Sequence, residues 1–363
     1  MSDLKFCKRM LPRVSRTFAM AIRVLPPALG RPVLLAYLLC RIADTIEDDT
    51  SIPAPLRVEA LKQYADAVEA LCGSWDPEVS ALLDDKLRAL ASQSRFVEAD
   101  EETRQSWSLA VESARVILSV NRLPSEQKKL IAGCVGEMSR GMAATISREV
   151  MVIDPAMPVV CRPLIGALDN ENELVQYADC VAGTVGRFLQ QLFCAQLGLT
   201  DGDRRRGLER TAFHFSLGLQ YTNIVQDIVA DRARGWSYVP RSLASFHGLA
   251  VECLLDPAAR ESSLEIVKDL IRKSLDHLEG ALEFTLLIPR SAPRIRLFCL
   301  WPLFLALSTL KRAWDNPEVL EAKVKIGRGE VRRLLRATSL RCLGEGALRQ
   351  LYRRESLWAP TQP

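Results

Sequence analysis

The chain has 363 residues, of which 48% are hydrophobic and 25% are charged, and its formal net charge is +4. This composition is typical of a globular protein, and so small an excess of positive charge gives no reason to expect a nucleic-acid partner. The sequence contains no internal repeat and no linker rich in glycine or serine. We therefore expect a single domain over residues 1–363, with residues 1–14 and 340–363 less ordered than the rest.

The predicted secondary structure is helical throughout. Apolar residues recur at intervals of three and four, and no segment shows the alternation of a half-buried strand, so the predicted fold class is all-α. Prolines, glycines and charge clusters leave residues 151–169, 201–206, 234–240 and 248–257 as loops. The predicted helices, in chain order, cover residues 15–25, 31–50, 56–71, 78–91, 101–120, 124–150, 173–197, 207–233, 262–285 and 293–314.

The most apolar segment, residues 297–310, contains Pro302 and is shorter than the roughly 20 residues that span a bilayer, so we predict a buried helix. The basic amino terminus lacks the apolar core of a signal peptide, and the chain ends in polar residues. Its ten cysteines lack the spacing of a zinc site and favour a reducing compartment. We expect a cytoplasmic monomer without a transmembrane segment that contacts membranes peripherally at most.

An acidic stretch at residues 44–49 follows directly on an apolar run. Asp44, Glu47 and Asp48 stand at i, i+3 and i+4, so on a helix they project from one face. Like charges at this spacing repel each other and weaken the helix, which favours a partner of opposite charge. Arg41 lies on the same face, where it would either pair with Asp44 or hold a phosphate.

A second polar face lies downstream, where Asn223, Asp227 and Asp231 recur at i, i+4 and i+8 in a largely apolar segment. Two such faces can converge across a helical bundle. Oxygen ligands suit Mg²⁺, which proteins usually bind through a few carboxylates together with substrate phosphates. The sequence therefore predicts a Mg²⁺–diphosphate clamp beside an apolar cavity; the alternative is two acidic faces exposed to solvent. Such a cavity would keep water from a carbocation left by a departing diphosphate.

Both motifs resemble those of the squalene/phytoene synthases, the head-to-head isoprenyl diphosphate synthases. The segment DTIED beginning at Asp44 matches the first motif of that family, and NIVQDIVAD beginning at Asn223 matches the second. The resemblance extends from about residue 15 to about residue 330. It implies a single helical bundle of the isoprenoid synthase type with a central apolar cavity. It also implies Mg²⁺, or Mn²⁺ in its place, bound by Asp44, Glu47, Asp48, Asn223, Asp227 and Asp231.

The resemblance implies farnesyl diphosphate as the substrate and the squalene synthase reaction. Two molecules would condense head to head to presqualene diphosphate, and an NADPH-dependent rearrangement would give squalene. Residues 138–143 and 181–186 match segments that line the family's reaction cavity. By the same resemblance, Tyr37 and Tyr177 join the five carboxylates as catalytic residues, Arg16, Arg41, Gln220 and Asn223 bind substrate, and Lys323, Lys325 and Arg328 bind NADPH.

Three positions depart from the family pattern. Cys180 stands where a reactive-site tyrosine is usual, Gln226 replaces an arginine before Asp227, and Trp236 follows Gly235 where an arginine is usual. The missing tyrosine affects the rearrangement more than the first ionisation. The alternatives are therefore a family member that makes presqualene diphosphate, dehydrosqualene or phytoene without reduction, and a non-catalytic synthase-like scaffold.

Glycines and histidines complete the residues of interest. Gly133, Gly136 and Gly141 fall inside one predicted helix, where each costs about 1 kcal/mol relative to alanine. We interpret them as sites of close helix packing, with close approach to a ligand as the alternative. The dispersed histidines are interpreted as structural or exposed; they are His214, His247 and His277.

Overall fold

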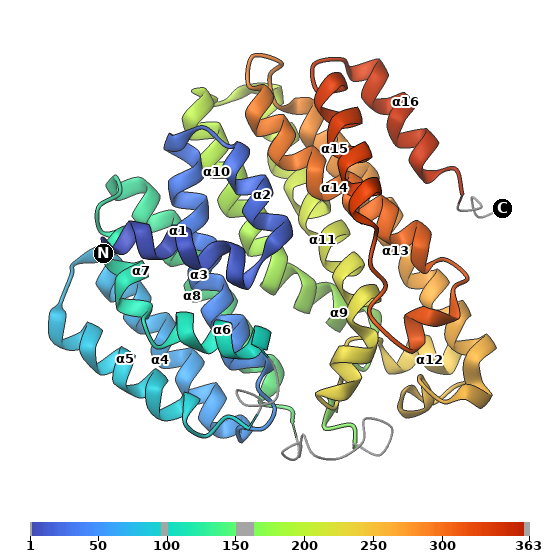
Figure 1. The fold of residues 1–363 in the computed structure, drawn as a ribbon, viewed down its shortest axis with the longest axis horizontal. Helices are drawn as coiled ribbons and strands as arrows, with labels where there is room; N and C mark the ends of the chain where they lie inside the picture. The colour runs from blue at the N-terminus through green and yellow to red at the C-terminus, as the bar shows by residue number, and fades with distance from the viewer. Residues whose placement is uncertain (1, 96–100, 150–162, 359–363) are drawn as a thin grey trace.

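The computed structural model describes residues 2–95, 101–149 and 163–358 and has the all-α architecture that the sequence predicts. The first half of the chain lies on one side of a helical bundle and the second half on the other (Figure 1). The α-helices are α1 (Asp3–Val14), α2 (Arg16–Val24), α3 (Pro27–Asp48), α4 (Ala54–Gly73), α5 (Pro77–Ala91), α6 (Glu101–Ala110), α7 (Ser113–Val120), α8 (Ser125–Ile146), α9 (Glu171–Ala178), α10 (Thr184–Leu197), α11 (Gly202–Ala233), α12 (Arg241–Phe246), α13 (Arg260–Leu287), α14 (Pro293–Ala313), α15 (Arg328–Arg341) and α16 (Glu345–Ser356).

Helix α3, which carries the first acidic motif, is buried over most of its length. It begins at Pro27, four residues before the predicted start, because proline is well tolerated in the first turn of a helix, where its missing N–H is not needed. Leu35, Leu38 and Ile42 are fully buried. These residues fix α3 in the core, so the acidic side chains at its carboxyl end are held against the interior.

Helix α11, which carries the second acidic motif, is 32 residues long and packs along α13. It begins at Gly202, so the prediction of a turn over residues 201–206 is wrong for most of that segment. His214 of α11 and His277 of α13 lie with their Nδ1 atoms 2.9 Å apart, which agrees with a structural role for these histidines. Gly186 lets α10 approach α11 closely, because a side chain there would overlap Ser216 and the Ala212 carbonyl.

The predicted helix over residues 173–197 is interrupted by a π-helical turn. Helix α9 runs directly into the turn at Asp179–Gly183, and α10 follows it. A π-turn inserts an extra residue into the helix, changes the direction of the side chains around it and occurs often at functional sites. The predicted helix over residues 101–120 is likewise broken, between α6 and α7.

A two-stranded parallel ladder, which the sequence does not predict, joins β1 (Gly166–Ala167) to β2 (Trp236–Ser237). Strands of two residues are too short to show an alternating pattern. Gly166 is required there because the ring of Trp236 occupies the space of a side chain. The ladder therefore places the chain that leaves α11 against the segment that leads into α9.

Helix α14 is a core helix, as predicted. It is the one helix in the described residues that is long and apolar enough to cross a membrane, but 78% of its apolar window is buried inside the protein. Most of the described residues at the two chain ends, which we expect to be less ordered, are helical. Helix α1 buries Phe6 and Cys7, and α16 buries Leu348 and Leu351, because both helices are amphipathic and pack on the bundle.

Candidate active site

The two acidic faces meet at one cavity of about 290 Å³ between α3 and α11. The convergence that the sequence predicts is therefore present in the structure. The predicted site residues that line this cavity are Tyr37, Arg41, Asp44, Glu47, Asp48, Tyr177, Gln220, Asn223, Asp227 and Asp231.

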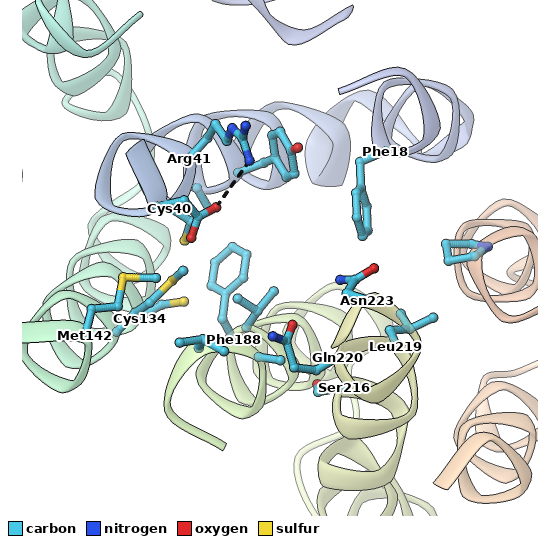
Figure 2. A pocket seen from close by; sticks show the side chains of 18 of the residues that line it. Phe18, Cys40, Arg41, Cys134, Met142, Phe188, Ser216, Leu219, Gln220 and Asn223 are labelled. Atoms are coloured by element: carbon cyan, nitrogen blue, oxygen red, sulfur yellow. Dashed lines mark ion pairs between the residues drawn. The ribbon is translucent and has the colours of Figure 1, made fainter. Parts of the chain in front are cut away.

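The rest of the cavity wall is largely apolar. Phe18 of α2, Met142 of α8 and Phe188 of α10 belong to it. In Figure 2 Phe188 stands between Arg41 of α3 and Gln220 of α11, which approach from facing sides. Polar groups are thus confined to part of the wall, and the remainder is suited to an apolar chain.

One guanidinium joins the two acidic motifs. Arg234, which follows α11 directly, places Nη1 3.2 Å from Asp48 Oδ2, and its Nη2 donates a hydrogen bond to Asp231 Oδ1. The side chain of Asp231 is only 6% exposed. Because Asp48 belongs to α3 and Asp231 to α11, Arg234 ties the two acidic helices together across the cavity.

Lys323, predicted to bind cofactor, contacts the second acidic motif. Its Nζ lies 2.5 Å from Asp227 Oδ1. The neighbouring Gln226 Nε2 donates a hydrogen bond of 3.1 Å to the carbonyl of Val324. The segment after the 3₁₀-helix Pro317–Leu320 therefore crosses α11 at this motif, and Gln226 helps to hold it there.

The other two residues predicted to bind cofactor, Lys325 and Arg328, are exposed. Neither belongs to the set of described residues that line the cavity. They follow Lys323 on the same crossing segment and at the start of α15. Their role in binding NADPH stays a prediction.

Arg41 lies between several acceptors. Its Nη1 is 4.0 Å from Asp44 Oδ2, and its Nη2 is 3.6 Å from Glu102 Oε1 and donates a hydrogen bond of 3.4 Å to Ser106 Oγ. Pairing with Asp44 and binding of a phosphate therefore both stay open as roles of Arg41, since its distance to Asp44 is long and its guanidinium also lines the cavity. Arg16 begins α2, but its side chain lies outside the described residues.

Negative charge in the cavity exceeds the positive charge that faces it. Burial raises the pKa of Asp44 to about 7, although Arg41 lowers it, and raises the pKa of Asp231 to about 7 against the opposing effect of Arg234. Burial also raises the pKa of Glu47 well above its usual range. Glu47 Oε1 is buried without a hydrogen-bond partner in the described part of the protein. The site would therefore be stabilised by a further cation.

The donor set fits Mg²⁺, although Asp48, Asp227 and Asp231 are paired with protein cations in this structure. Across residues 2–95, 101–149 and 163–358, no three His, Cys, Asp or Glu side chains are grouped so as to hold a metal ion. The available donors are carboxylate and amide oxygens from two helices, which is the chemistry that a hard cation prefers. The unpartnered oxygen of Glu47 and the excess of carboxylates agree with this assignment.

Two stacked tyrosines form the wall beside Glu47. The rings of Tyr177 and Tyr238 lie 4.4 Å apart, and burial raises the pKa of both phenols well above the usual value. Tyr37 lies with its ring 5.5 Å from that of Phe18, and burial raises its pKa to about 12. All three phenols therefore keep their protons at neutral pH. Tyr238 is not identified by sequence reasoning, because it follows the short strand β2.

Asp49 and Arg57 brace the end of α3 from outside the cavity. Asp49, which adjoins the first motif, accepts hydrogen bonds from Trp107 Nε1 at 2.9 Å and from Ser51 Oγ at 2.5 Å. Arg57 is fully buried and donates a 2.5 Å hydrogen bond to the carbonyl of Glu47. The contacts of Trp107 and Arg57 could not be anticipated, because both residues belong to chain segments outside α3.

The comparison with protein families decides the family of the chain. Residues 11–330 match the model described as squalene/phytoene synthase. The chain belongs to this family.

Curated members of the squalene/phytoene synthase family resemble the chain over most of its length. The squalene synthase of Eremothecium gossypii is 26% identical over 330 residues, which cover 90% of this chain and 66% of that protein. A squalene synthase of Botryococcus braunii is 27% identical over 343 residues, which cover 92% of this chain and 63% of that protein. The squalene synthase of Saccharomyces cerevisiae is 26% identical over 326 residues, which cover 90% of this chain and 65% of that protein. The chain thus spans 63–66% of the length of these relatives.

Solved structures of the family share the fold. A structure of TcSQS with the ligand E5700 superposes with a TM-score of 0.75 and 23% identity, and covers 98% of this chain and 91% of that one. A dehydrosqualene synthase in complex with a ligand gives a TM-score of 0.56 and 17% identity, with coverage of 92% and 94%. At these identities the likeness establishes the isoprenoid synthase fold and nothing finer.

Two departures from the family pattern have structural explanations. Cys180 lies in the π-turn, with its Sγ 3.6 Å from the carbonyl of Met138, and its side chain fills the space left by Gly141. Burial raises the pKa of the Cys180 thiol to about 12, so it is protonated and a poor nucleophile. Trp236 is buried against Gly166 and, among the described residues, is not part of the cavity wall. The interpretation as a site of close packing is therefore confirmed for Gly141 but wrong for Gly133, where no atom lies within 4 Å of the place that a side chain would take.

Proposed function

We propose that this protein is a squalene synthase. The observation that carries the proposal is the convergence of both acidic motifs on one largely apolar cavity. Family membership and the names of the curated relatives support it. In the proposed reaction two farnesyl diphosphates condense head to head to presqualene diphosphate, which is then rearranged and reduced by NADPH to squalene.

The residues of the two motifs would hold the metal and the diphosphate. Bound Mg²⁺ supplies neutralisation of the negative charge that develops on the leaving diphosphate. Arg41 lines the cavity beside the first motif, where its guanidinium is suited to bidentate contact with phosphate oxygens. The residues that would hold Mg²⁺, or Mn²⁺ in its place, are Asp44, Glu47, Asp48, Asn223, Asp227 and Asp231.

The apolar wall would protect the carbocation that each ionisation leaves behind. Phe18 and Phe188 present aromatic rings to the cavity, and aromatic faces attract cations. The protonated phenols of Tyr37 and Tyr177 are not bases at neutral pH and would not quench a cation by removing a proton. They can donate hydrogen bonds to a diphosphate or fix the position of the isoprenoid chain. The proposed reaction therefore depends on the exclusion of water from the cavity more than on acid–base catalysis.

We assign NADPH to the side of the cavity where the segment after residue 320 crosses α11. Contacts of Lys323 and Val324 with the second motif hold that segment next to the cavity. Lys323, Lys325 and Arg328 together offer three cations for the extra phosphate of NADPH. The alternative is a family member that stops before reduction, which the replacement of the usual tyrosine by Cys180 favours.

We further propose a cytoplasmic monomer that touches membranes peripherally. Squalene is an apolar hydrocarbon, so its release into a bilayer is favoured over release into water. Helix α2 lies between the cavity, which Phe18 and Ile22 face, and an outer groove lined in part by Met20 and Val24.

Product analysis tests the proposal. The purified chain is incubated with farnesyl diphosphate and Mg²⁺, with and without NADPH, and the extracted lipids are identified by mass spectrometry after phosphatase treatment. Squalene that forms only with NADPH is the expected result. If presqualene diphosphate forms both with and without NADPH, the protein is a family member that stops before reduction and not a squalene synthase. An absence of product from both farnesyl and geranylgeranyl diphosphate would favour the scaffold, and Asp44→Ala and Asp227→Ala should abolish any product.

A further inference from the structure

A hydrogen bond between the adjacent residues holds the contact between Lys323 and Asp227 in place. Lys323 Nζ lies 2.5 Å from Asp227 Oδ1, and the next residue, Val324, accepts the hydrogen bond of Gln226 Nε2 at 3.1 Å. Val324 is itself buried, at 4% exposure. Two consecutive residues of the crossing segment therefore contact two consecutive residues of α11, which fixes the ammonium beside the carboxylate.

Lys323 supplies the positive charge that pairs with Asp227 of the second motif. Arg234 binds Asp48 and Asp231 and is the only other cation for which the structure describes an ion pair with the motif aspartates of α11. Lys323 supplies the ion pair of Asp227. Its side chain is 47% exposed, so it can leave the carboxylate for solvent without unfolding the bundle.

An ammonium and a divalent cation at the same carboxylate oxygen repel each other, because two positive charges then lie within a few ångströms. Asp227 is one of the residues that fit Mg²⁺, and its Oδ1 is the atom that Lys323 contacts. A metal ion held by Asp227 would therefore compete with Lys323 for this carboxylate and favour its displacement. Once displaced, the ammonium is free to meet phosphate groups beside Lys325 and Arg328.

We propose that Lys323 is an internal counter-ion of Asp227 that a divalent cation displaces. Lys323 thereby couples metal loading of the second motif to the position of the segment that follows residue 320. The proposal rests on the metal clamp of the proposed function but not on the identity of the product. It makes Lys323 a positioning residue, distinct from the residues that hold metal.

Metal binding by the full chain tests the displacement. Isothermal titration with MgCl₂ at constant ionic strength compares the wild type with Lys323→Met, with the charge-retaining Lys323→Arg, and with Lys311→Met, an exposed lysine in the last turn of α14. Lys323→Met should bind Mg²⁺ roughly two- to fivefold more tightly, the size expected for loss of a partly exposed ion pair. Lys323→Arg and Lys311→Met should bind as the wild type does.

Equal or weaker binding by Lys323→Met would overturn the proposal while leaving the metal clamp intact. No Mg²⁺ binding by any variant would overturn the clamp and the counter-ion together.

Amide hydrogen exchange gives a second readout that does not depend on activity. Mg²⁺ should speed exchange in residues 321–327 of the wild type, whereas Lys323→Met should exchange there at the faster rate even without metal. KCl at matched ionic strength controls for simple screening of the ion pair. Exchange that Mg²⁺ leaves unchanged in the wild type would contradict the displacement.

Discussion

At the scale of single residues, Arg234 stabilises the approach of the two acidic motifs in the absence of metal. Arg234→Gln removes the cation between Asp48 and Asp231, so the metal-free protein should lose about 1–3 kcal/mol of stability. Mg²⁺ can replace the lost charge. Thermal melts with and without MgCl₂ should therefore show a larger stabilisation by Mg²⁺ in the variant than in the wild type.

The control for this substitution is Arg232→Gln, which removes the same charge two residues earlier. Arg232 does not belong to the described residues that line the cavity. Its loss should leave the response to Mg²⁺ as in the wild type. An equal Mg²⁺ response in Arg234→Gln and the wild type would refute the bridging role of Arg234.

Asp231 makes the stability of the metal-free protein depend on pH. Burial raises its pKa from the usual 3.8 to about 7, so in this interval the folded state binds a proton that the unfolded state has released. Stability should therefore fall as pH rises through this interval and stay low above it. Asp231→Asn cannot ionise and should lessen the fall, by up to about 4 kcal/mol.

Urea unfolding in the presence of a chelator, near pH 5 and near pH 8, measures this effect. The control is Asp203→Asn, because the side chain of Asp203 is 99% exposed on the same helix. That variant should follow the wild-type dependence on pH. The same fall in Asp231→Asn as in the wild type would assign the pH dependence to other groups.

The carboxylates could be predicted from the sequence because their spacing is a local property. Residues at i, i+3 and i+4 share a helical face wherever the helix lies, so Asp44, Glu47 and Asp48 needed no tertiary information. Arg234 and Lys323 could not be placed in the same way. Their positions depend on how the chain turns after α11 and on a segment that returns to it from much later in the sequence.

At the scale of helices, the contact between α8 and the π-turn can be tested by a double-mutant cycle. An alanine at Gly141 would overlap Cys180 Sγ and lie 3.1 Å from its Cβ, so Gly141→Ala should cost about 1–3 kcal/mol. Cys180→Ala removes the overlapping sulfur. The double variant should therefore be more stable than Gly141→Ala alone, as measured by urea unfolding.

Gly133→Ala is the matched control on the same helix. No atom lies within 4 Å of the place that its side chain would take, so this substitution should raise stability by up to about 1 kcal/mol. If the effects of Gly141→Ala and Cys180→Ala simply add, the packing account of Gly141 is wrong.

The helices themselves were largely predictable, whereas the interruptions between them were not. Periodicity identifies a buried face along residues 173–197, but a π-turn leaves that periodicity almost unchanged. The turn at Asp179–Gly183 is instead stabilised by tertiary contacts such as that of Cys180 with α8. The two-residue strands at Gly166 and Trp236 left no signal in the sequence because they are too short to show an alternating pattern.

At the scale of the whole molecule, composition and periodicity predicted one helical bundle but not the role of its first helices. The sequence predicts no helix over residues 3–14, where α1 lies. The apolar face of α1 is buried, and the exposed face carries Lys5, Lys8 and Arg9 in line with Pro12. In Figure 1 α1 and α2 lie next to each other at the amino-terminal side of the bundle.

This arrangement sets a basic face beside an apolar groove. Pro12 lines the groove of about 480 Å³ together with Met20, Val24 and Trp301. Lys5 and Lys8 share the helical face of Pro12, so the positive charge borders the groove. A surface of this kind suits an anionic lipid bilayer, where basic side chains meet headgroups and apolar side chains enter the interface.

Vesicle binding tests the peripheral contact. The full chain is sedimented with phosphatidylcholine vesicles that contain or lack phosphatidylglycerol, and the anionic vesicles should bind it more strongly. Lys5→Gln combined with Lys8→Gln should weaken this binding about tenfold or more, because each basic residue near an anionic surface contributes about 1 kcal/mol. Lys62→Gln combined with Lys86→Gln removes the same charge from exposed positions on α4 and α5 and should bind as the wild type does. If both double variants lose the same amount of binding, the contact depends on the net charge of the protein and not on the face of α1. If the chain binds neither kind of vesicle, the proposal that product is released into a membrane is wrong.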